Sequence, residues 1–237
     1  MKVIECNVRA SRSFPFVSKV TGHNFIEITT LVLLKKYKPQ AYETLELDYV
    51  GVKAPQFSYN RLKGSNPVAH VEMASTGEVA CIGERLSDAF FRSWLSTDQW
   101  LKGKRILVSI SSHHKVKLLE SLRALEEKGW EIYATEGTHD FLSKNGVGSI
   151  FVYKVSQKHE PNAATLIEQK EIDLIINIPK KTSLRVKTDG FNIRRLAIDH
   201  HIPLITNVQL SALLLNCLKE MDATSLEVKS WNEFISL

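Results

Sequence analysis

The sequence predicts an α/β protein in two parts: a doubly wound, five-stranded parallel sheet in residues 101–237, preceded in residues 1–100 by a mostly antiparallel piece. Two observations predict this division. From Lys104 onward, short apolar runs alternate with segments whose apolar residues recur at helical spacing. Before Trp100, short strand-like runs are separated by turn signals. Successive parallel strands need helical crossovers, so alternation favours a parallel sheet covered on both faces.

In the first part, the turn signals are "KGSNP" at Lys63–Pro67 and "STGE" at Ser75–Glu78. Such clusters of Gly, Pro, Ser and Asn between strand-like runs are typical of hairpins. Two helices are expected, at Asn24–Lys36 and Leu86–Leu95, because each carries an apolar side. This part therefore resembles an antiparallel fragment more than a self-contained fold.

In the second part, each strand is a compact apolar run and each helix ends near a glycine or polar turn. The strands are expected at Ile106–Ile110, Trp130–Ala134, Ser149–Val155, Asp173–Ile178 and Pro203–Thr206. The helices are expected from Val116 until Gly129 stops the first of them, and then at Thr138–Asn145, Ala163–Gln169, Asn192–His200 and Ser211–Met221.

Composition limits the function classes. The 237 residues are 43% hydrophobic and 24% charged, as in ordinary globular proteins. The net charge of +5 is spread along the chain, so no nucleic-acid partner is expected. Cys6, Cys81 and Cys217 lack CxxC spacing, which indicates neither a disulfide framework nor a zinc site. No signal-like or membrane-spanning run occurs, so no membrane partner is expected and the predicted location is the cytoplasm, with the mitochondrial matrix as the alternative.

The strand ends predict the position of a ligand site, because open parallel sheets bind ligands beyond the carboxyl ends of their strands. The residues just past the five strand ends are rich in hydroxyl, amide and ammonium groups, and Glu136 is a rare carboxylate among them. They are Ser111–Lys115, Thr135–Thr138, Lys154–Lys158, Asn177–Lys181, and Thr206 with Asn207. Such groups suit an oxyanion such as phosphate or carboxylate. The alternative is that residues such as Thr138 and Asn207 only cap helices.

Several long motifs resemble one family. "IECNVRASRSFPFVSKVTG", "VKAPQFSYNRLKGSNP" and "VEMASTGEVACIGE" resemble the end of the second ATP-grasp module of the carbamoyl phosphate synthetase large chain. "ILVSISSHHK", "IYATEGTHDFL", "DLIINIPKK" and "IRRLAIDHHIPLITN" resemble its C-terminal methylglyoxal-synthase-like domain, which binds allosteric effectors. The resemblance covers nearly the whole chain. It implies an ATP-grasp remnant in residues 1–100 and an effector-binding domain in residues 101–237.

The resemblance implies roles for four residues near the start of the chain. Glu5 and Asn7 match positions where side chains of one strand hold the Mg²⁺ ions that bridge ATP phosphates. Arg9 and Arg12 match arginines that neutralise the transferring phosphoryl group. The implied chemistry is the phosphorylation of carbamate to carbamoyl phosphate, with ATP and Mg²⁺ as cofactors.

The family's nucleotide-clamping lysine, glycine-rich loop and second magnesium carboxylate lie upstream of this region. We therefore expect this chain alone to bind an effector without turnover, and whether it acts as an enzyme stays open. The implied partners are the remainder of the synthetase large chain and a glutamine amidotransferase subunit, in pyrimidine or arginine synthesis. The alternative is a stand-alone sensor module that docks on a separate synthetase chain.

In the second part, the resemblance implies that Lys115, Thr135, Thr138, Lys154 and Asn177 hold a small phosphorylated effector such as a nucleotide. Lys154 stands where acetylglutamate-activated members carry a tryptophan, which favours a phosphorylated effector. Pro179, in contrast, resembles the acetylglutamate type, so both effector types stay open. Arg194 and Arg195 could also reach the anion, although such a pair is more often a salt-bridged helix face.

A working methylglyoxal synthase is the less favoured alternative. That enzyme uses a buried aspartate base near a glycine-rich phosphate loop. The stretch "IPKKTSLRVKTDG" after Asn177 has no such loop, and its carboxylate, Asp189, lies at its far end. Asp140 follows the threonine pair within a predicted helix, where a surface role is expected.

Overall fold

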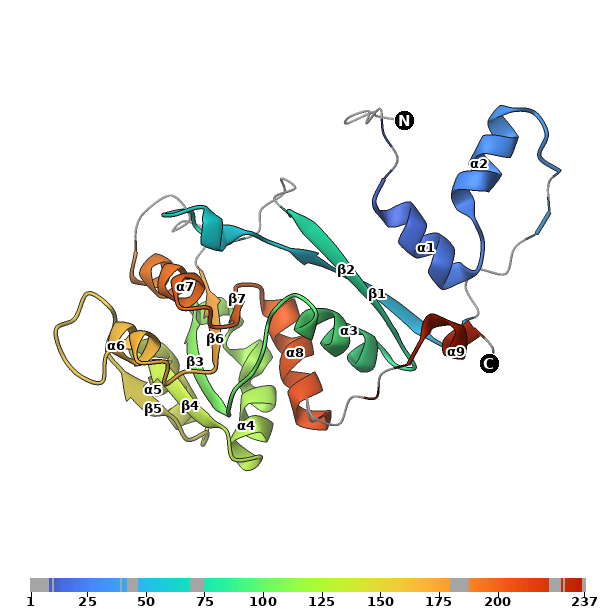
Figure 1. The fold of residues 1–237 in the computed structure, drawn as a ribbon. Coiled ribbons are helices and arrows are strands. Elements are labelled where there is room, and N and C mark those ends of the chain that lie inside the picture. The colour runs from blue at the N-terminus through green and yellow to red at the C-terminus, as the bar shows by residue number, and fades with distance from the viewer. Residues whose placement is uncertain are drawn as a thin grey trace. The chain divides into compact units, whose positions relative to one another are not determined.

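The computed structural model describes residues 9, 11–38, 40–41, 47–68, 75–179, 188–221, 227 and 229–235. They form two compact units, drawn in Figure 1. The first contains the described residues up to Ala54, Val79–Ser93, and those from Glu227 on. The second contains the described residues of Pro55–Glu78 and of Trp94–Leu226. No helix within the described ranges combines the length and apolarity needed to cross a bilayer.

The first unit contains helices and most of a two-stranded antiparallel sheet. Its elements are α1 (Ser13–Thr21), α2 (Phe25–Leu33), β1 (Val50–Gln56), β2 (Gly77–Gly83), α3 (Leu86–Leu95) and α9 (Trp231–Ile235), although residues 55–56 of β1, 77–78 of β2 and 94–95 of α3 belong to the second unit. Gly22, with a φ of 71°, ends α1, and the Asn24 side chain accepts a hydrogen bond from the Glu27 amide at the start of α2. The expected α2 and α3 are present, whereas α1 was not expected from the sequence.

The second unit contains the five-stranded parallel sheet that the sequence predicts. Its strands follow the order β5-β4-β3-β6-β7, and every neighbouring pair is parallel. They are β3 (Arg105–Ile110), β4 (Glu131–Thr135), β5 (Ile150–Val152), β6 (Leu174–Ile178) and β7 (Leu204–Ile205). The order reverses direction between β5 and β6, so the carboxyl end of the central strand β3 lies at a topological switch point.

Helices precede, connect and follow these strands. The α-helices are α4 (Leu119–Glu127), α5 (Glu136–Lys144), α6 (Ala163–Glu168), α7 (Asp189–Asp199) and α8 (Val208–Glu220); the 3-10 helices are η1 (Tyr59–Arg61), η2 (Ser112–His114) and η3 (Val116–Leu118). Three α-helices begin before the predicted residue: α5 at Glu136 instead of Thr138, α7 at Asp189 instead of Asn192, and α8 at Val208 instead of Ser211. The first helix begins at Val116 as predicted, with a 3-10 turn. The side chains of Thr188 and Asn207 cap α7 and α8, and apolar spacing does not reveal such caps.

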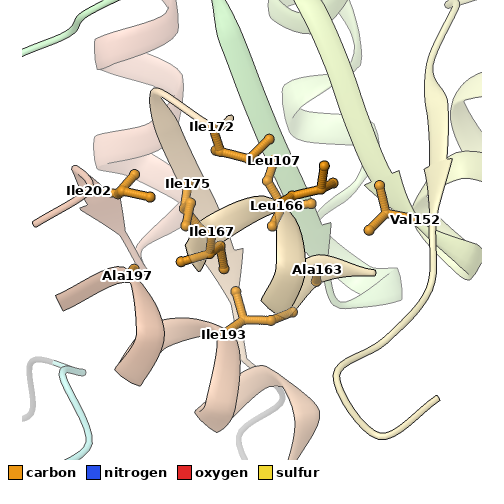
Figure 2. Packing of buried hydrophobic residues seen from close by; sticks show 10 residues of the cluster. All are labelled: Leu107, Val152, Ala163, Leu166, Ile167, Ile172, Ile175, Ile193, Ala197 and Ile202. Atoms are coloured by element: carbon orange, nitrogen blue, oxygen red, sulfur yellow. The ribbon is translucent and has the colours of Figure 1, made fainter. Parts of the chain in front are cut away.

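The sheet is covered on both faces. Helices α4 and α8 pack together on one face (Figure 1). On the other face, α6 and α7 pack against the strands, and Figure 2 shows this apolar cluster. Leu107 of β3 and Ile175 of β6 lie at its centre, both fully buried. Side chains alternate along a strand, so every second residue of β3 and β6 faces α6 and α7.

Replacement of Ile175 by alanine tests this core. The side chain is fully buried in the cluster, so its truncation should lower the free energy of unfolding by about 2–5 kcal/mol. Urea denaturation of the whole chain measures this loss. The control is Val116→Ala, whose parent side chain is 71% exposed and whose effect should stay within about 0.5 kcal/mol. Equal losses in both variants would contradict the described core.

Candidate functional site

Three polar residues lie together at the carboxyl edge of the sheet. Ser109 of β3 pairs in register with Asn177 of β6. The hydroxyl of Thr135, at the end of β4, donates a 3.1 Å hydrogen bond to Ser109 Oγ. Asn177 lies two residues beyond Ile175, on the face that α6 and α7 cover. The strand ends therefore bring Thr135 and Asn177 to the two sides of Ser109, a residue that sequence reasoning did not single out.

The first turn of α5 begins directly at this edge. Thr138 is buried in that turn, and its Oγ1 accepts a 3.1 Å hydrogen bond from the amide of Ile110 at the end of β3. Because the oxygen is the acceptor here, this bond does not use the hydroxyl hydrogen. The alternative that Thr138 caps its own helix is wrong, because α5 starts at Glu136 and the hydroxyl binds the neighbouring strand. For Asn207 the same alternative is confirmed, since its side chain accepts from the amides of Gln209 and Leu210.

Two lysines reach the same turn of α5. Lys115 Nζ donates to the carbonyl of Gly137 and lies 5.9 Å from the centre of the Phe141 ring. A Cβ atom at position 137 would lie 3.4 Å from that ammonium, so glycine lets it approach closely. Lys154 Nζ, from the segment after β5, lies 3.7 Å from a carboxylate oxygen of Glu136. Both predicted lysines are therefore next to Thr135 and Thr138.

Asn177 meets the buried arginine of α7. Arg194 Nη1 donates a 2.6 Å hydrogen bond to Asn177 Oδ1, and Arg194 Nε donates a 3.0 Å bond to Asn66 Oδ1. The Arg194 side chain is fully buried, and its Nη2 has no partner within the described part of the chain. Burial lowers the pKa of Arg194 to about 10. Sequence reasoning noted Arg194 but missed Asn66, which lies 128 residues away.

Arg195 forms a salt bridge on the face of its helix, as the alternative to effector binding predicts. Its Nε and Nη2 donate to the two carboxylate oxygens of Asp199, at 3.0 and 2.6 Å. Hydrogen bonding to Arg195 lowers the pKa of the Asp199 carboxyl. Its Nη1 donates to the carbonyls of Tyr59, Leu62 and Ser65 at 3.2–3.4 Å. Arg195 therefore links the backbone around η1 to α7 through hydrogen bonds.

The two aspartates considered for a methylglyoxal-synthase reaction do not have the surroundings of a catalytic base. Asp189 accepts hydrogen bonds from the amide and hydroxyl of Ser156, at 2.8 and 3.0 Å, and so joins the start of α7 to the segment after β5. Asp140 is exposed on α5. Neither carboxylate is buried as a catalytic base of that type requires.

Two of the four residues predicted for the ATP-grasp remnant, Arg9 and Arg12, are described by the structure. Glu5 and Asn7 lie outside the described residues, so their Mg²⁺ role stays a prediction. Arg9 is exposed, and Arg12, also exposed, directly precedes α1. Within the described ranges, no group of three or more His, Cys, Asp and Glu residues could hold a metal ion.

One family model and several larger known proteins match this chain. The family model of the MGS-like domain matches residues 117–206. The multifunctional protein URA2 of Saccharomyces cerevisiae is 41% identical over 251 residues, which covers 100% of this chain and 11% of that protein. Human mitochondrial carbamoyl-phosphate synthase (ammonia) is 40% identical over 237 residues, which covers 94% of this chain and 16% of that protein. The chain thus spans a small fraction of these curated relatives.

One similar solved structure is the methylglyoxal synthase from Elizabethkingia anophelis. It shares 16% sequence identity with this chain and superposes with a TM-score of 0.40. The match covers 56% of this chain and 91% of that one.

Substitution of Thr138 by valine tests the hydroxyl's structural contact. Valine has nearly the same shape but leaves the buried amide of Ile110 without its acceptor. We expect a loss of about 1–3 kcal/mol in the free energy of unfolding, measured by urea denaturation. Thr165→Val is the matched control, because the Thr165 hydroxyl only donates to exposed Glu160. If Thr138→Val is as stable as its control, the hydrogen bond between α5 and β3 does not form.

Proposed function

Because the family model of the MGS-like domain matches residues 117–206 and human mitochondrial carbamoyl-phosphate synthase (ammonia) is 40% identical over 94% of this chain, we propose that the chain is a regulatory portion of such a synthetase. In this proposal, the carboxyl edge of the sheet binds a small anionic effector. The convergence of Lys115, Lys154, Thr135 and Thr138 on the first turn of α5 carries the proposal.

The chemistry of these groups favours an oxyanion. Ammonium groups, hydroxyls and the free amides of a helix start are the donors that bind phosphate in proteins. Asn177 adds its Nδ2, which makes no hydrogen bond to a described residue because only its Oδ1 is engaged. Two lysine charges on one helix turn suit the compact double charge of a phosphate monoester better than the two carboxylates of acetylglutamate, which its carbon chain holds apart. A phosphorylated effector, such as a nucleotide, is therefore our proposal, with acetylglutamate as the alternative that Pro179 favours.

Glu136 is the one feature of this turn that opposes an anion. Its carboxylate lies 3.7 Å from Lys154 Nζ, and the two side chains are 60% and 42% exposed. An ion pair this exposed is weak, so a phosphate can displace the carboxylate at small cost. Glu136 thus competes with the effector for Lys154 and lowers the affinity of the site.

The wider role in carbamoyl phosphate synthesis is also a proposal. Helix α2 has no buried residue among those described, and Val32, Leu33 and Leu34 at its end are 51–78% exposed. Such an apolar surface is typical of an interface, and we propose that it contacts the remainder of the synthetase. There, ATP and Mg²⁺ would bind a complete ATP-grasp module to which Glu5, Asn7, Arg9 and Arg12 contribute. Ammonia would come from a glutamine amidotransferase subunit, for pyrimidine or arginine synthesis.

Calorimetric titration tests the effector site directly. Uridine monophosphate, phosphoribosyl pyrophosphate and acetylglutamate are each added to the purified chain. We expect saturable binding of at least one phosphorylated compound, because two ammonium groups reach the first turn of α5. Binding of acetylglutamate alone would identify the alternative effector type, and no binding of any of the three would overturn the proposed function.

Glu136→Gln should strengthen the binding of a phosphorylated effector. The substitution removes the carboxylate that competes for Lys154 while keeping the size of the side chain. Because the pair is exposed, we expect a gain in affinity of about two- to fivefold, measured by the same titration. Glu168→Gln, at an exposed position of α6, removes the same charge elsewhere and should change the affinity less than twofold. A lower affinity in Glu136→Gln would show that Glu136 contributes a contact to the effector.

A further inference from the structure

The buried guanidinium of Arg194 has unusual surroundings. Buried charges in proteins are normally paired with an opposite charge. Among the described residues, the hydrogen-bond partners of Arg194 are two neutral amide oxygens, Asn177 Oδ1 at 2.6 Å and Asn66 Oδ1 at 3.0 Å. Its Nη2 is buried and has no partner among the described residues. Among the described residues, no carboxylate therefore balances this buried charge.

The contact with Asn177 decides how its carboxamide is turned. A guanidinium can only donate hydrogen bonds, so the atom of Asn177 that faces it must be the oxygen. The nitrogen, Nδ2, then points away from Arg194 and offers its two hydrogens elsewhere. Without Arg194, the carboxamide could turn over and present an oxygen, which repels an anion. Arg194 therefore determines that Asn177 presents a hydrogen-bond donor, and not an acceptor, at the sheet edge.

Gly190 leaves room for the two side chains beside the start of α7. A Cβ atom at this second residue of α7 would lie 3.2 Å from Arg194 Nη1 and 3.5 Å from Asn177 Oδ1. Contacts of 3.2 Å are tighter than side chains normally make, so a larger residue would push on the guanidinium. The start of α7 thus approaches the end of β6 closely enough for the 2.6 Å hydrogen bond.

Arg194 also joins the sheet edge to a distant segment. Its second hydrogen bond goes to Asn66, and the adjacent Arg195 holds the carbonyls of Tyr59, Leu62 and Ser65. One helix therefore fixes both Asn177 and residues 59–66. A change in the position of Arg194 would therefore alter its hydrogen bonds to both Asn177 and Asn66.

We propose that Arg194 is the positioning residue of the effector site: it turns Asn177 Nδ2 toward an acceptor oxygen of the anionic effector and couples occupancy of the site to the order of residues 59–66. The inference rests on the function proposed above. This role explains why the side chains of Asn66 and Asn177 are uncharged. A carboxylate at either position would neutralise Arg194, and at position 177 it would also remove the donor.

Three variants and a control test the proposal, with uridine monophosphate as the titrated probe and phosphoribosyl pyrophosphate as the second. Arg194→Met should lower the affinity at least tenfold, because the carboxamide of Asn177 is no longer oriented. Arg194→Lys retains the charge but not the two-armed geometry, and should lower the affinity by a smaller factor. Arg123→Met removes a partly exposed arginine on α4 that contacts Asn145, and should change the affinity less than twofold.

Asn177→Asp separates positioning from a structural role. The aspartate can still accept from Arg194 and adds a charge pair, so the thermal midpoint should not fall. It lacks the Nδ2 donor and repels an anion, so the affinity should fall at least tenfold. A purely structural role predicts instead that stability and affinity change together. If Arg194→Met does not fold, Arg194→Lys and Asn177→Asp decide the question.

Hydrogen exchange tests the coupling. In the wild-type chain, saturating probe should slow amide exchange across residues 59–66, and this effect should disappear in Arg194→Lys. The inference is overturned if the Arg194 variants bind the probe as tightly as the wild type does, or if the probe leaves exchange at residues 59–66 unchanged. If the wild type binds none of the effectors named above, the proposed function itself fails, which is a different outcome.

Discussion

The register of β3 between β4 and β6 is the constraint on which the candidate site depends. It places Ser109 beside Asn177 and within hydrogen-bond reach of Thr135, and it aims all three at the face that α7 covers. A slip of one residue would turn these side chains to the other face and bring apolar ones in their place. The buried cluster around Leu107 and Ile175 prevents such a slip, because it would expose that core.

The two edges of the sheet are stabilised differently. At the amino end of β3, the buried carboxylate of Asp173 accepts from the amide and guanidinium of Arg105, so the charges are paired. At the carboxyl end, the buried cation Arg194 has only amide oxygens as described partners. The paired charges of Asp173 and Arg105 are typical of a contact that only stabilises the fold. The arrangement around Arg194 leaves donors in excess at the edge where parallel sheets bind ligands, which is why the effector proposal and the role of Arg194 belong together.

Much of the fold could be predicted, because apolar periodicity and strand alternation can be recognised among residues that are close in the sequence. The five strands and the helices between them were expected within a few residues. Helix α1 was not expected: its sequence, "SFPFVSKVT", buries no residue and contains a proline, so it lacks the usual signal. The strand ends predicted Thr135, Thr138, Lys154 and Asn177 as neighbours. The contact of Arg194 with Asn66 could not be predicted, since it joins positions 128 residues apart and no local pattern encodes it.

Chemical-shift mapping is the most direct test of the central claim that the carboxyl edge of the sheet presents donors to an anion. Backbone and side-chain amide resonances of the labelled chain would be recorded during addition of a phosphorylated effector. The account predicts that the largest shifts arise at residues 135–138, at the Asn177 side-chain amide and at Lys154, while the amino edge near Gly103 and Gly129 stays unchanged. Shifts centred on the amino edge, with residues 135–138 unaffected, would contradict it.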